Sequence, residues 1–250
     1  MHVLTLSLDT SSPFGSLAIL RGDSLLGVVS THSEENYSSR MFRHLEFLLH
    51  DLSLKLGDFD LFSVAAGPGS FTGLRVGLTA AKGWAEVFRK PVVGVSALEA
   101  VSVQAFPQLS SPASWVVPIL DARRGQIYCA FYQHTHSGLK LDSDQCVMSP
   151  DELFGEIRKR AGAIPGGAKG EIVIATPEPQ LISDALSRFE NSGATSPAVS
   201  IILQHVSAVL APWIGRLGIA SAQRGEFSDP LTLDANYVRR SDAELQLKGK

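Results

Sequence analysis

Hydrophobic residues in the first part of the chain alternate with polar ones and then change to a helical spacing. Residues 2–8 alternate, and two more such segments, 16–20 and 24–30, follow a turn at 9–15. Alternation is typical of half-buried strands, so the pattern predicts an opening antiparallel meander. Residues 37–56 carry apolar side chains three and four positions apart, which predicts an amphipathic helix. One stripe of that helix holds Met41, Leu45 and Leu48, and a second holds Phe42 and Leu49.

The most unusual pattern lies between residues 61 and 89. An apolar strand over 61–66 is followed by Gly67-Pro68-Gly69 and then by a helix from about residue 72 to residue 89. The surface of this helix is apolar almost all the way round, so more than one of its sides must be covered. One face consists mainly of small residues, which let another helix approach closely. The members of this face are Gly73, Gly77, Ala80 and Trp84.

Strands followed by helices recur in the second half of the chain. The pattern predicts strands at 92–95, 115–120, 126–132 and 171–175, and helices at 150–160, 179–189 and 201–224, the last interrupted at Pro212. Ser149 is the expected N-cap of the helix at 150–160. A stretch rich in Pro and Ser at 106–114 marks a boundary. We therefore expect an α/β chain of two small domains, one of residues 1–104 with 201–224 and a smaller one of residues 105–200 with 225–250.

Composition narrows the classes of function. The chain has 250 residues and a formal net charge of −3, so it lacks the basic field that direct, non-specific nucleic-acid binding needs. Its two cysteines are too few for a disulfide framework, and no spacing of Cys and His indicates a metal site. No apolar run reaches the ~20 residues that span a bilayer, and polar side chains interrupt the first apolar segment. These features favour a soluble, cytoplasmic protein that makes no membrane contact.

Two segments could bind an anion, and each also has a purely structural interpretation. Asp9, Thr10 and Ser11 follow the first strand, where an acid and hydroxyls could hold a metal-bound water and phosphate oxygens. The alternative is an Asx turn in which Asp9 accepts hydrogen bonds from nearby backbone amides. Residues 67–73 could hold an anion at a helix N-terminus, or could form a turn in which Ser70 or Thr72 caps the helix. They match neither the dinucleotide fingerprint nor a P-loop.

Several motifs together resemble the bacterial TsaB family, also called YeaZ. They lie at residues 6–11, 66–77, 90–98, 120–128 and 236–244, and the run Gly-Pro-Gly-Ser-Phe-Thr-Gly-Leu-Arg within the second is highly characteristic. The resemblance implies two tandem domains of the actin-like ATPase (ribonuclease-H-like, ASKHA) fold. It also implies a role in forming N6-threonylcarbamoyladenosine beside the anticodon of tRNAs that read codons starting with A.

The family resemblance further implies a partner and a surface. In that pathway TsaD transfers the threonylcarbamoyl group, TsaB is its required non-catalytic partner, and the ATPase TsaE joins them. TsaB-family proteins bind TsaD through two N-terminal helices and form homodimers through the same surface, and tRNA is reached through the complex. The residues expected at this surface are Tyr37, Met41, Leu45, Leu48, Gly73, Gly77, Ala80 and Trp84.

One contrast with TsaD and two departures from the TsaB pattern bear on what the resemblance implies. TsaD carries a His-x-x-x-His metal pair, and the matching positions here are Ala97 and Val101, so we expect no metal and no transferase site. Many TsaB sequences carry His where this chain has Tyr37. The loop at 175–179 is poor in glycine, which leaves weak binding of ATP or ADP open, with no cofactor required. The rival hypotheses are an independent ATPase or phosphotransferase that uses Asp9 and Thr10, and a metallopeptidase relative.

Overall fold

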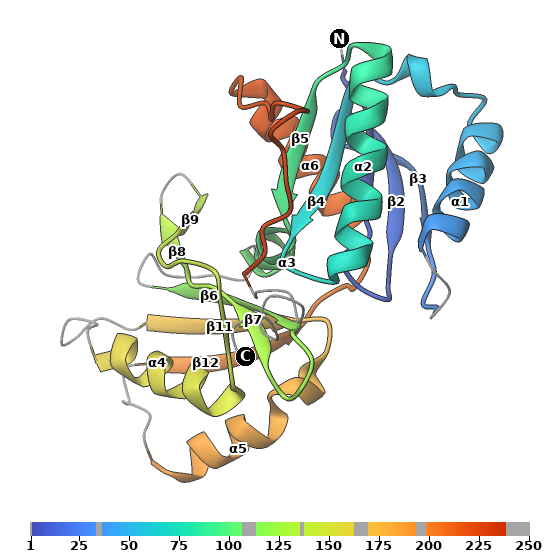
Figure 1. The fold of residues 1–250 in the computed structure, drawn as a ribbon. Helices are drawn as coiled ribbons and strands as arrows, with labels where there is room; N and C mark the ends of the chain where they lie inside the picture. Colours follow the sequence, from blue (N-terminus) through green and yellow to red (C-terminus); the bar gives the residue numbers. More distant parts are fainter. Residues whose placement is uncertain are drawn as a thin grey trace, which may run out of the picture. The chain divides into compact units, whose positions relative to one another are not determined.

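A computed structural model describes residues 2–33, 37–106, 114–135, 138–162, 170–193 and 199–238 (Figure 1). The chain divides into two compact units, one of Met1–Ala100 with Ala208–Lys250 and one of Val101–Ser207. The boundary falls inside α3 (Ala97–Ala105). Residues 107–113 of the expected boundary segment, and the residues from 239 onward, lie outside the described residues.

The first unit is built on a five-stranded sheet in the order β3-β2-β1-β4-β5. The strands are β1 (Leu4–Asp9), β2 (Ser16–Arg21), β3 (Ser24–Ser30), β4 (Leu61–Gly67) and β5 (Val92–Ser96). The first three form the expected antiparallel meander, in which Gly22 takes the left-handed conformation (φ 57°) that the tight turn requires. β1, β4 and β5 then run parallel, as strands joined by a crossover helix do.

Helices cover both faces of this sheet. They are α1 (Tyr37–Asp51), α2 (Phe71–Phe88) and α6 (Ala211–Gln223), with a short 3₁₀ turn, η1 (Leu56–Asp58), after α1. On β4, the ring of Phe62 packs against Trp84 of α2, whereas the neighbouring Ser63 faces Gly218 of α6. Because successive side chains of a strand point to opposite faces, α2 and α6 cover opposite sides of the sheet. α1 packs beside β2 and β3.

The second unit repeats this arrangement with the sheet order β10-β7-β6-β11-β12, and β8 and β9 extend it beside β6. Its strands are β6 (Trp115–Asp121), β7 (Ile127–Cys129), β8 (Tyr132–Thr135), β9 (Gly138–Leu141), β10 (Cys146–Met148), β11 (Gly170–Thr176) and β12 (Val199–His205). Its helices are α4 (Pro150–Gly162) and α5 (Ser183–Asn191), the latter preceded by the 3₁₀ turn η3 (Pro179–Leu181).

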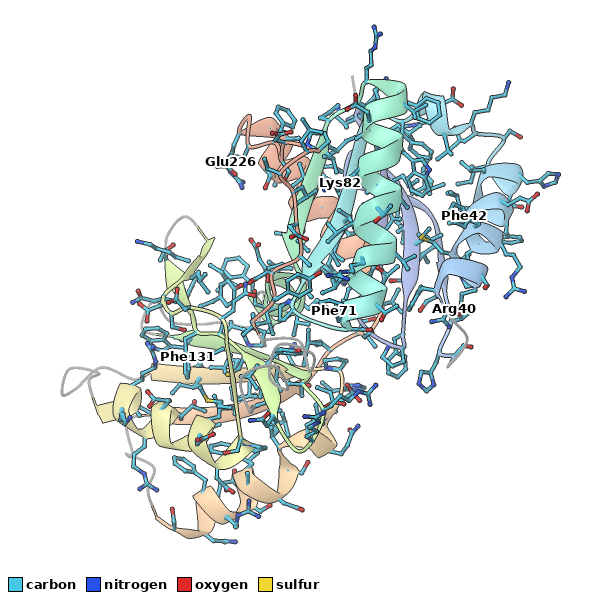
Figure 2. All side chains as sticks on the ribbon, viewed as in Figure 1. Arg40, Phe42, Phe71, Lys82, Phe131 and Glu226 are labelled. Carbon is cyan, nitrogen blue, oxygen red and sulfur yellow. The ribbon has the colours of Figure 1, made fainter. Side chains whose placement is uncertain are left out.

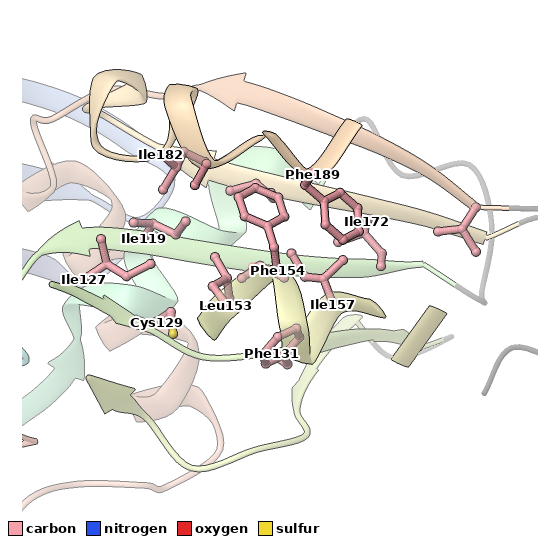
Figure 3. Close-up of a cluster of buried hydrophobic side chains, with 14 residues drawn as sticks. Ile119, Ile127, Cys129, Phe131, Leu153, Phe154, Ile157, Ile172, Ile182 and Phe189 are labelled. Atoms are coloured by element: carbon pink, nitrogen blue, oxygen red, sulfur yellow. The ribbon is translucent and has the colours of Figure 1, made fainter. Parts of the chain in front are cut away.

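The core of the second unit lies between its sheet and these two helices (Figure 3). Phe154 of α4 stacks on Phe189 of α5 with ring centroids 5.0 Å apart, and both rings cover the isoleucines of β6 and β11. The predicted N-cap of α4 is present, because Ser149 and Glu152 exchange hydrogen bonds in a capping box.

The two sheets share one strand order and one pattern of directions. In each, an edge strand and its neighbour pair antiparallel, that neighbour pairs antiparallel with the central strand, and two parallel strands follow. The prediction of two tandem α/β units of the actin-like, ribonuclease-H-like fold is confirmed.

Several boundaries differ from the sequence-based expectation, and the strand expected over 126–132 is divided into β7 and β8. Residues 199–205 form strand β12 of the second sheet, not the beginning of a helix, and α6 starts only at Ala211 because Pro212 suits the first turn of a helix. Residues 225–238 belong to the first unit rather than the second. There, Ser228 bridges to Val92 of β5, and the Asn236 N–H donates to the Ala66 carbonyl at 2.6 Å. In the part of the chain that the structure describes, no helix combines the length and apolar character needed to cross a bilayer.

Candidate protein-interaction surface

The Gly-Pro-Gly turn starts α2 and fixes it to the end of β1. The Ser70 hydroxyl caps the helix by accepting the Gly73 N–H at 3.3 Å. The Ser70 N–H donates to the Ser11 carbonyl at 2.7 Å. Gly69 is needed at this contact, because a Cβ there would lie 2.4 Å from the same carbonyl oxygen. The amides of Ser70 and Gly73 are thus engaged within the chain, and capping by Ser70 is the interpretation of this turn that holds.

The small-residue face of α2 packs against the chain's own backbone, which corrects the expected partner surface. A Cβ on Gly73 would lie 2.0 Å from the Thr10 carbonyl oxygen, and one on Gly77 would lie 2.3 Å from the Thr10 hydroxyl. Trp84 is half-buried against Phe62, with ring centroids 5.8 Å apart. Gly73 and Gly77 do allow a close approach, but the segment that approaches them is Thr10, in the turn that follows β1.

The main stripe of α1 is buried for a similar reason. Met41, Leu45 and Leu48 are only 2–3% exposed, because α1 lies beside β2 and β3. Leu48 reaches within 3.0 Å of the place where a Cβ on Gly27 would stand. The expectation that this stripe meets a partner is corrected for Leu45 and Leu48, which hold α1 in place.

Tyr37 also turns toward its own unit. Its hydroxyl donates to the Ser12 carbonyl at 3.0 Å and occupies the space where a Cβ on Gly15 would stand. The guanidinium of buried Arg40 lies 4.2 Å from the Tyr37 ring centroid and donates to the Pro13 carbonyl. Burial raises the pKa of the Tyr37 hydroxyl. The side chain therefore fixes the start of α1 on the loop that follows β1.

An open groove of about 460 Å³ lies between α1 and α2. Phe42 stands on its α1 side with 53% of its surface exposed, and Phe71 lies at the start of α2 (Figure 2). Of the residues predicted to meet a partner, Met41 and Ala80 line this groove. Sequence reasoning missed its other residues. The full lining is Met41, Phe42, Phe71, Thr72, Arg75, Val76, Thr79 and Ala80.

The rim of the groove at the start of α2 is held by an aromatic cluster. The Arg75 guanidinium lies 3.8 Å from the Phe71 ring centroid and donates to the Tyr237 hydroxyl at 3.0 Å. The two rings are 5.0 Å apart. Stacking and hydrogen bonding fix the planar cation, so the groove has an ordered, positively charged edge beside an apolar centre.

The apolar side of α2 continues past the groove to its C-terminal end. Gly83 has no atom within 4 Å of the place where a Cβ would stand, and Val87 is 73% exposed. Together with Val76 and Ala80 they form a stripe three and four residues apart, which is one face of a helix. Among the described residues of the first unit, nothing covers this side of α2. The sequence predicts that more than one side of this helix is covered, so one apolar face of α2 remains exposed in the isolated unit.

Asp9 lies at the end of β1 with its side chain fully buried. Its Oδ1 accepts the Ser11 N–H at 2.9 Å and the Ser11 hydroxyl at 2.6 Å, which is the geometry of the Asx-turn alternative. Its Oδ2 and the Thr10 hydroxyl have no hydrogen-bond partner among the described residues. Burial raises the pKa of Asp9 to about 6, and the bonds from Ser11 only partly offset that rise.

Replacing Asp9 with asparagine is expected to remove the loss of stability that ionisation of the Asp9 carboxyl causes as the pH rises. The folded carboxyl holds its proton more tightly than the unfolded one, so its contribution to stability is present at low pH and is lost as the pH rises through about 6. Relative to Asp9→Asn, the wild-type free energy of unfolding should fall by about 2 kcal/mol between about pH 4 and about pH 8. Urea titrations of both proteins across that range measure the difference. Parallel curves would show that Asp9 ionises as in the unfolded chain.

No group of three or more His, Cys, Asp and Glu side chains in the described ranges is arranged to hold a metal ion. Ala97 and Val101 both lie fully buried in α3 and carry no ligand atom. Asp9, which lies in one of the two segments considered for anion binding, is fully buried and accepts two hydrogen bonds from Ser11. The groove between α1 and α2, lined mainly by apolar side chains, is an uncovered apolar feature of the first unit.

Comparisons with known proteins identify the family. A family model described as "TsaD: tRNA N6-adenosine threonylcarbamoyltransferase" matches residues 22–212. The tRNA threonylcarbamoyladenosine biosynthesis protein TsaB of Bacillus subtilis is 37% identical over 59% of this chain and 63% of its own length, so the match spans less than two thirds of that relative. TsaB of Haemophilus influenzae is 34% identical over 63% of this chain and 69% of its own length.

Solved structures agree on the fold. YeaZ from Pseudomonas aeruginosa superposes with a TM-score of 0.67 at 20% identity and covers 94% of this chain and 99% of its own. The tRNA N6-adenosine threonylcarbamoyltransferase of Methylobacterium nodulans is also similar in sequence, at 31% identity, but the match covers only 44% of it. The model match spans most of the chain, and the TsaB relatives align over more than half of it. The chain belongs to the TsaB (YeaZ) family of tRNA threonylcarbamoyladenosine biosynthesis proteins.

Proposed function

We propose that this chain is a non-catalytic subunit that docks on TsaD and supports the transfer of threonylcarbamoyl to the adenosine beside the anticodon of tRNA. The observation that carries this proposal is the open groove between α1 and α2, with its exposed apolar stripe, in a member of the TsaB family. The proposed site of action is the cytoplasm, and tRNA is met through the complex rather than by this acidic chain alone.

The form of the groove suits a helical partner. Phe42 and Val76 provide an apolar centre, whereas Thr72 and Thr79 give it a polar border. An apolar core with a polar rim is the usual anatomy of a protein interface. Ala80 and Gly83 place no large side chain on the exposed side of α2, so a second helix can lie close to its backbone. We propose that helices of TsaD occupy this face, and that a second copy of the chain occupies it when TsaD is absent.

Within the described ranges, no set of His, Cys, Asp and Glu side chains is arranged to hold a metal ion, which supports an accessory role. The positions that match the metal-binding histidines of TsaD are Ala97 and Val101, which cannot bind a metal ion. In this proposal the chain requires no cofactor, although it binds ATP or ADP weakly. TsaE joins the chain and TsaD in the assembled complex.

An independent ATPase or phosphotransferase is the second candidate. The observation in its favour is that two buried oxygens, Asp9 Oδ2 and the Thr10 hydroxyl, have no hydrogen-bond partner within the described part of the chain. Against it, Asp9 is fully buried and its other oxygen is already bound by Ser11. Turnover of ATP by the isolated chain that Asp9→Ala abolishes would favour this candidate over the first. The metallopeptidase hypothesis requires stoichiometric metal in the purified chain, which elemental analysis measures.

The docking proposal is tested by mixing the purified chain with TsaD from the same organism. Size-exclusion chromatography with light scattering should show one complex with the mass of a chain bound to TsaD, and the homodimer peak should decline as that complex forms. Separate elution of the two proteins at about 10 µM, well above the Kd of an ordinary stable interface, would contradict the proposal.

A further inference from the structure

The two cysteines of the chain face each other across neighbouring strands of the second unit. Cys129 of β7 and Cys146 of β10 are direct register partners, and their sulfur atoms lie 3.6 Å apart. Directly opposed residues of an antiparallel pair have Cα atoms about 4.5–5.5 Å apart, within the range of about 4.4–6.8 Å that a disulfide spans. A bond between these sulfurs therefore needs side-chain rotation and no movement of the strands. Both thiols are free in the structure.

The two thiols differ in a way that suits stepwise oxidation. Cys129 is fully buried in the core of the unit (Figure 3). Cys146 lies on the edge strand and is partly exposed. The hydrogen bond with Cys129 lowers the pKa of Cys146, and Arg160 acts in the same direction, against burial and the charges of Glu156 and Asp144. The same hydrogen bond and burial raise the pKa of Cys129. The accessible sulfur is thus the one that favours the thiolate, which is the nucleophile toward oxidants.

We propose that Cys146 and Cys129 are a modification site at which a peroxide forms a reversible intrachain disulfide. The Cys146 thiolate attacks one oxygen of hydrogen peroxide, breaks the O–O bond and becomes a sulfenic acid, with release of one water after proton uptake. The Cys129 sulfur then attacks the Cys146 sulfur, its proton and the sulfenic hydroxyl leave as a second water, and the S–S bond forms. The peroxide is reduced by two electrons, and the two thiols supply them.

The bond would fix the edge of the second sheet. β10 has only three residues and, among the described strands, pairs with β7 alone. It leads directly into the capping box of α4 at Ser149. The bridged cysteines are 17 residues apart in sequence, so the bond closes the loop that carries β8 and β9. Closing such a loop restricts the unfolded chain and stabilises the fold.

Thiol counting and mass spectrometry on the full chain test the proposal. The reduced protein is treated with hydrogen peroxide, denatured and alkylated. The expected result is that both thiols disappear together, that the intact mass falls by two hydrogen atoms per chain, and that one peptide pair joins the two cysteines. Dithiothreitol should restore both thiols. Accumulation of sulfinic acid at Cys146 while Cys129 remains alkylatable, or chain-to-chain disulfides only, would overturn the proposal.

Two variants separate the steps. In Cys129→Ala, which keeps a small apolar group in the core, Cys146 should stop at a sulfenic acid that dimedone captures. In Cys146→Ser, Cys129 should stay reduced because it is buried. Oxidation of the wild type should raise the Tm of the second unit by about 5–10 °C, and oxidation of Cys146→Ser should leave it unchanged. Equal Tm values for oxidised and reduced wild type would overturn the claim that the bond fixes β10.

Discussion

Replacing Ala80 with arginine should abolish binding to TsaD while leaving the chain folded. Ala80 is half-buried in the lining of the groove, where a long side chain can extend outward without displacing the core. When a partner covers the groove, the guanidinium is enclosed without a matching charge. An uncompensated buried charge costs about 3 kcal/mol or more, so the Kd should rise at least ~100-fold. Isothermal titration with TsaD measures the affinity, and circular dichroism of the free chain checks the fold.

A matched pair of phenylalanines on α1 provides the control for this surface. Phe42 and Phe47 lie on the same helix and are 53% and 61% exposed, but only Phe42 lines the groove. Phe42→Ala should weaken binding ~30-fold, as loss of a central aromatic contact of about 2 kcal/mol does, and Phe47→Ala should change it ~2-fold or less. Equal losses in the two variants would mean that the contact surface is not the groove.

Replacing Gly73 with alanine should destabilise the first unit strongly. The added Cβ would lie 2.0 Å from the Thr10 carbonyl oxygen, and a backbone atom cannot turn aside as a flexible side chain does. Overpacking of this kind costs about 3 kcal/mol, which corresponds to a fall of roughly 10 °C in Tm. Thermal and urea unfolding of the isolated chain measure the effect.

The same helix offers a control for this change. Gly83 is exposed, and no atom lies within 4 Å of the position of an added Cβ. Gly83→Ala should stabilise the isolated chain by about 0.5–1 kcal/mol, because alanine favours the helix. If both glycine variants are stabilised, α2 does not pack on Thr10 as described. Gly77→Arg, which would collide with Thr10, is for the same reason a folding variant and not a clean probe of partner binding.

The order of strands and helices in the first unit could be predicted from hydrophobic spacing. Which face of each helix packs against the chain itself, and which stays exposed, could not. The spacing of Gly73 and Gly77 marks a close approach, and a partner helix or the chain's own backbone fits that pattern equally well. The Thr10 carbonyl decides between them, and its position depends on how β1 ends. The signal for Phe42 was present as the second stripe of α1, but only the packing of α1 on β2 and β3 shows which stripe stays free.

The second unit shows a different limit. Ile201, Ile202 and Leu203 form an apolar run that periodicity alone assigns equally to a buried helix or to a strand. Pairing with β11 makes it a strand, and such pairing depends on residues far away in the sequence. The cap at Ser149 depends only on neighbours within one turn, and it was predicted correctly. Asp9 likewise forms a local Asx turn, which its sequence neighbours indicate.

The central claim is that this chain acts by docking on TsaD through the groove between α1 and α2. The most direct measurement is the rate of threonylcarbamoyl transfer to tRNA by TsaD, supplied with threonylcarbamoyl-adenylate and TsaE, in the presence of the wild-type chain, of Ala80→Arg or of no chain. We expect transfer with the wild type, and with Ala80→Arg a rate as low as that without the chain. Full transfer without the chain, or equal rates with the wild type and Ala80→Arg, would contradict the account.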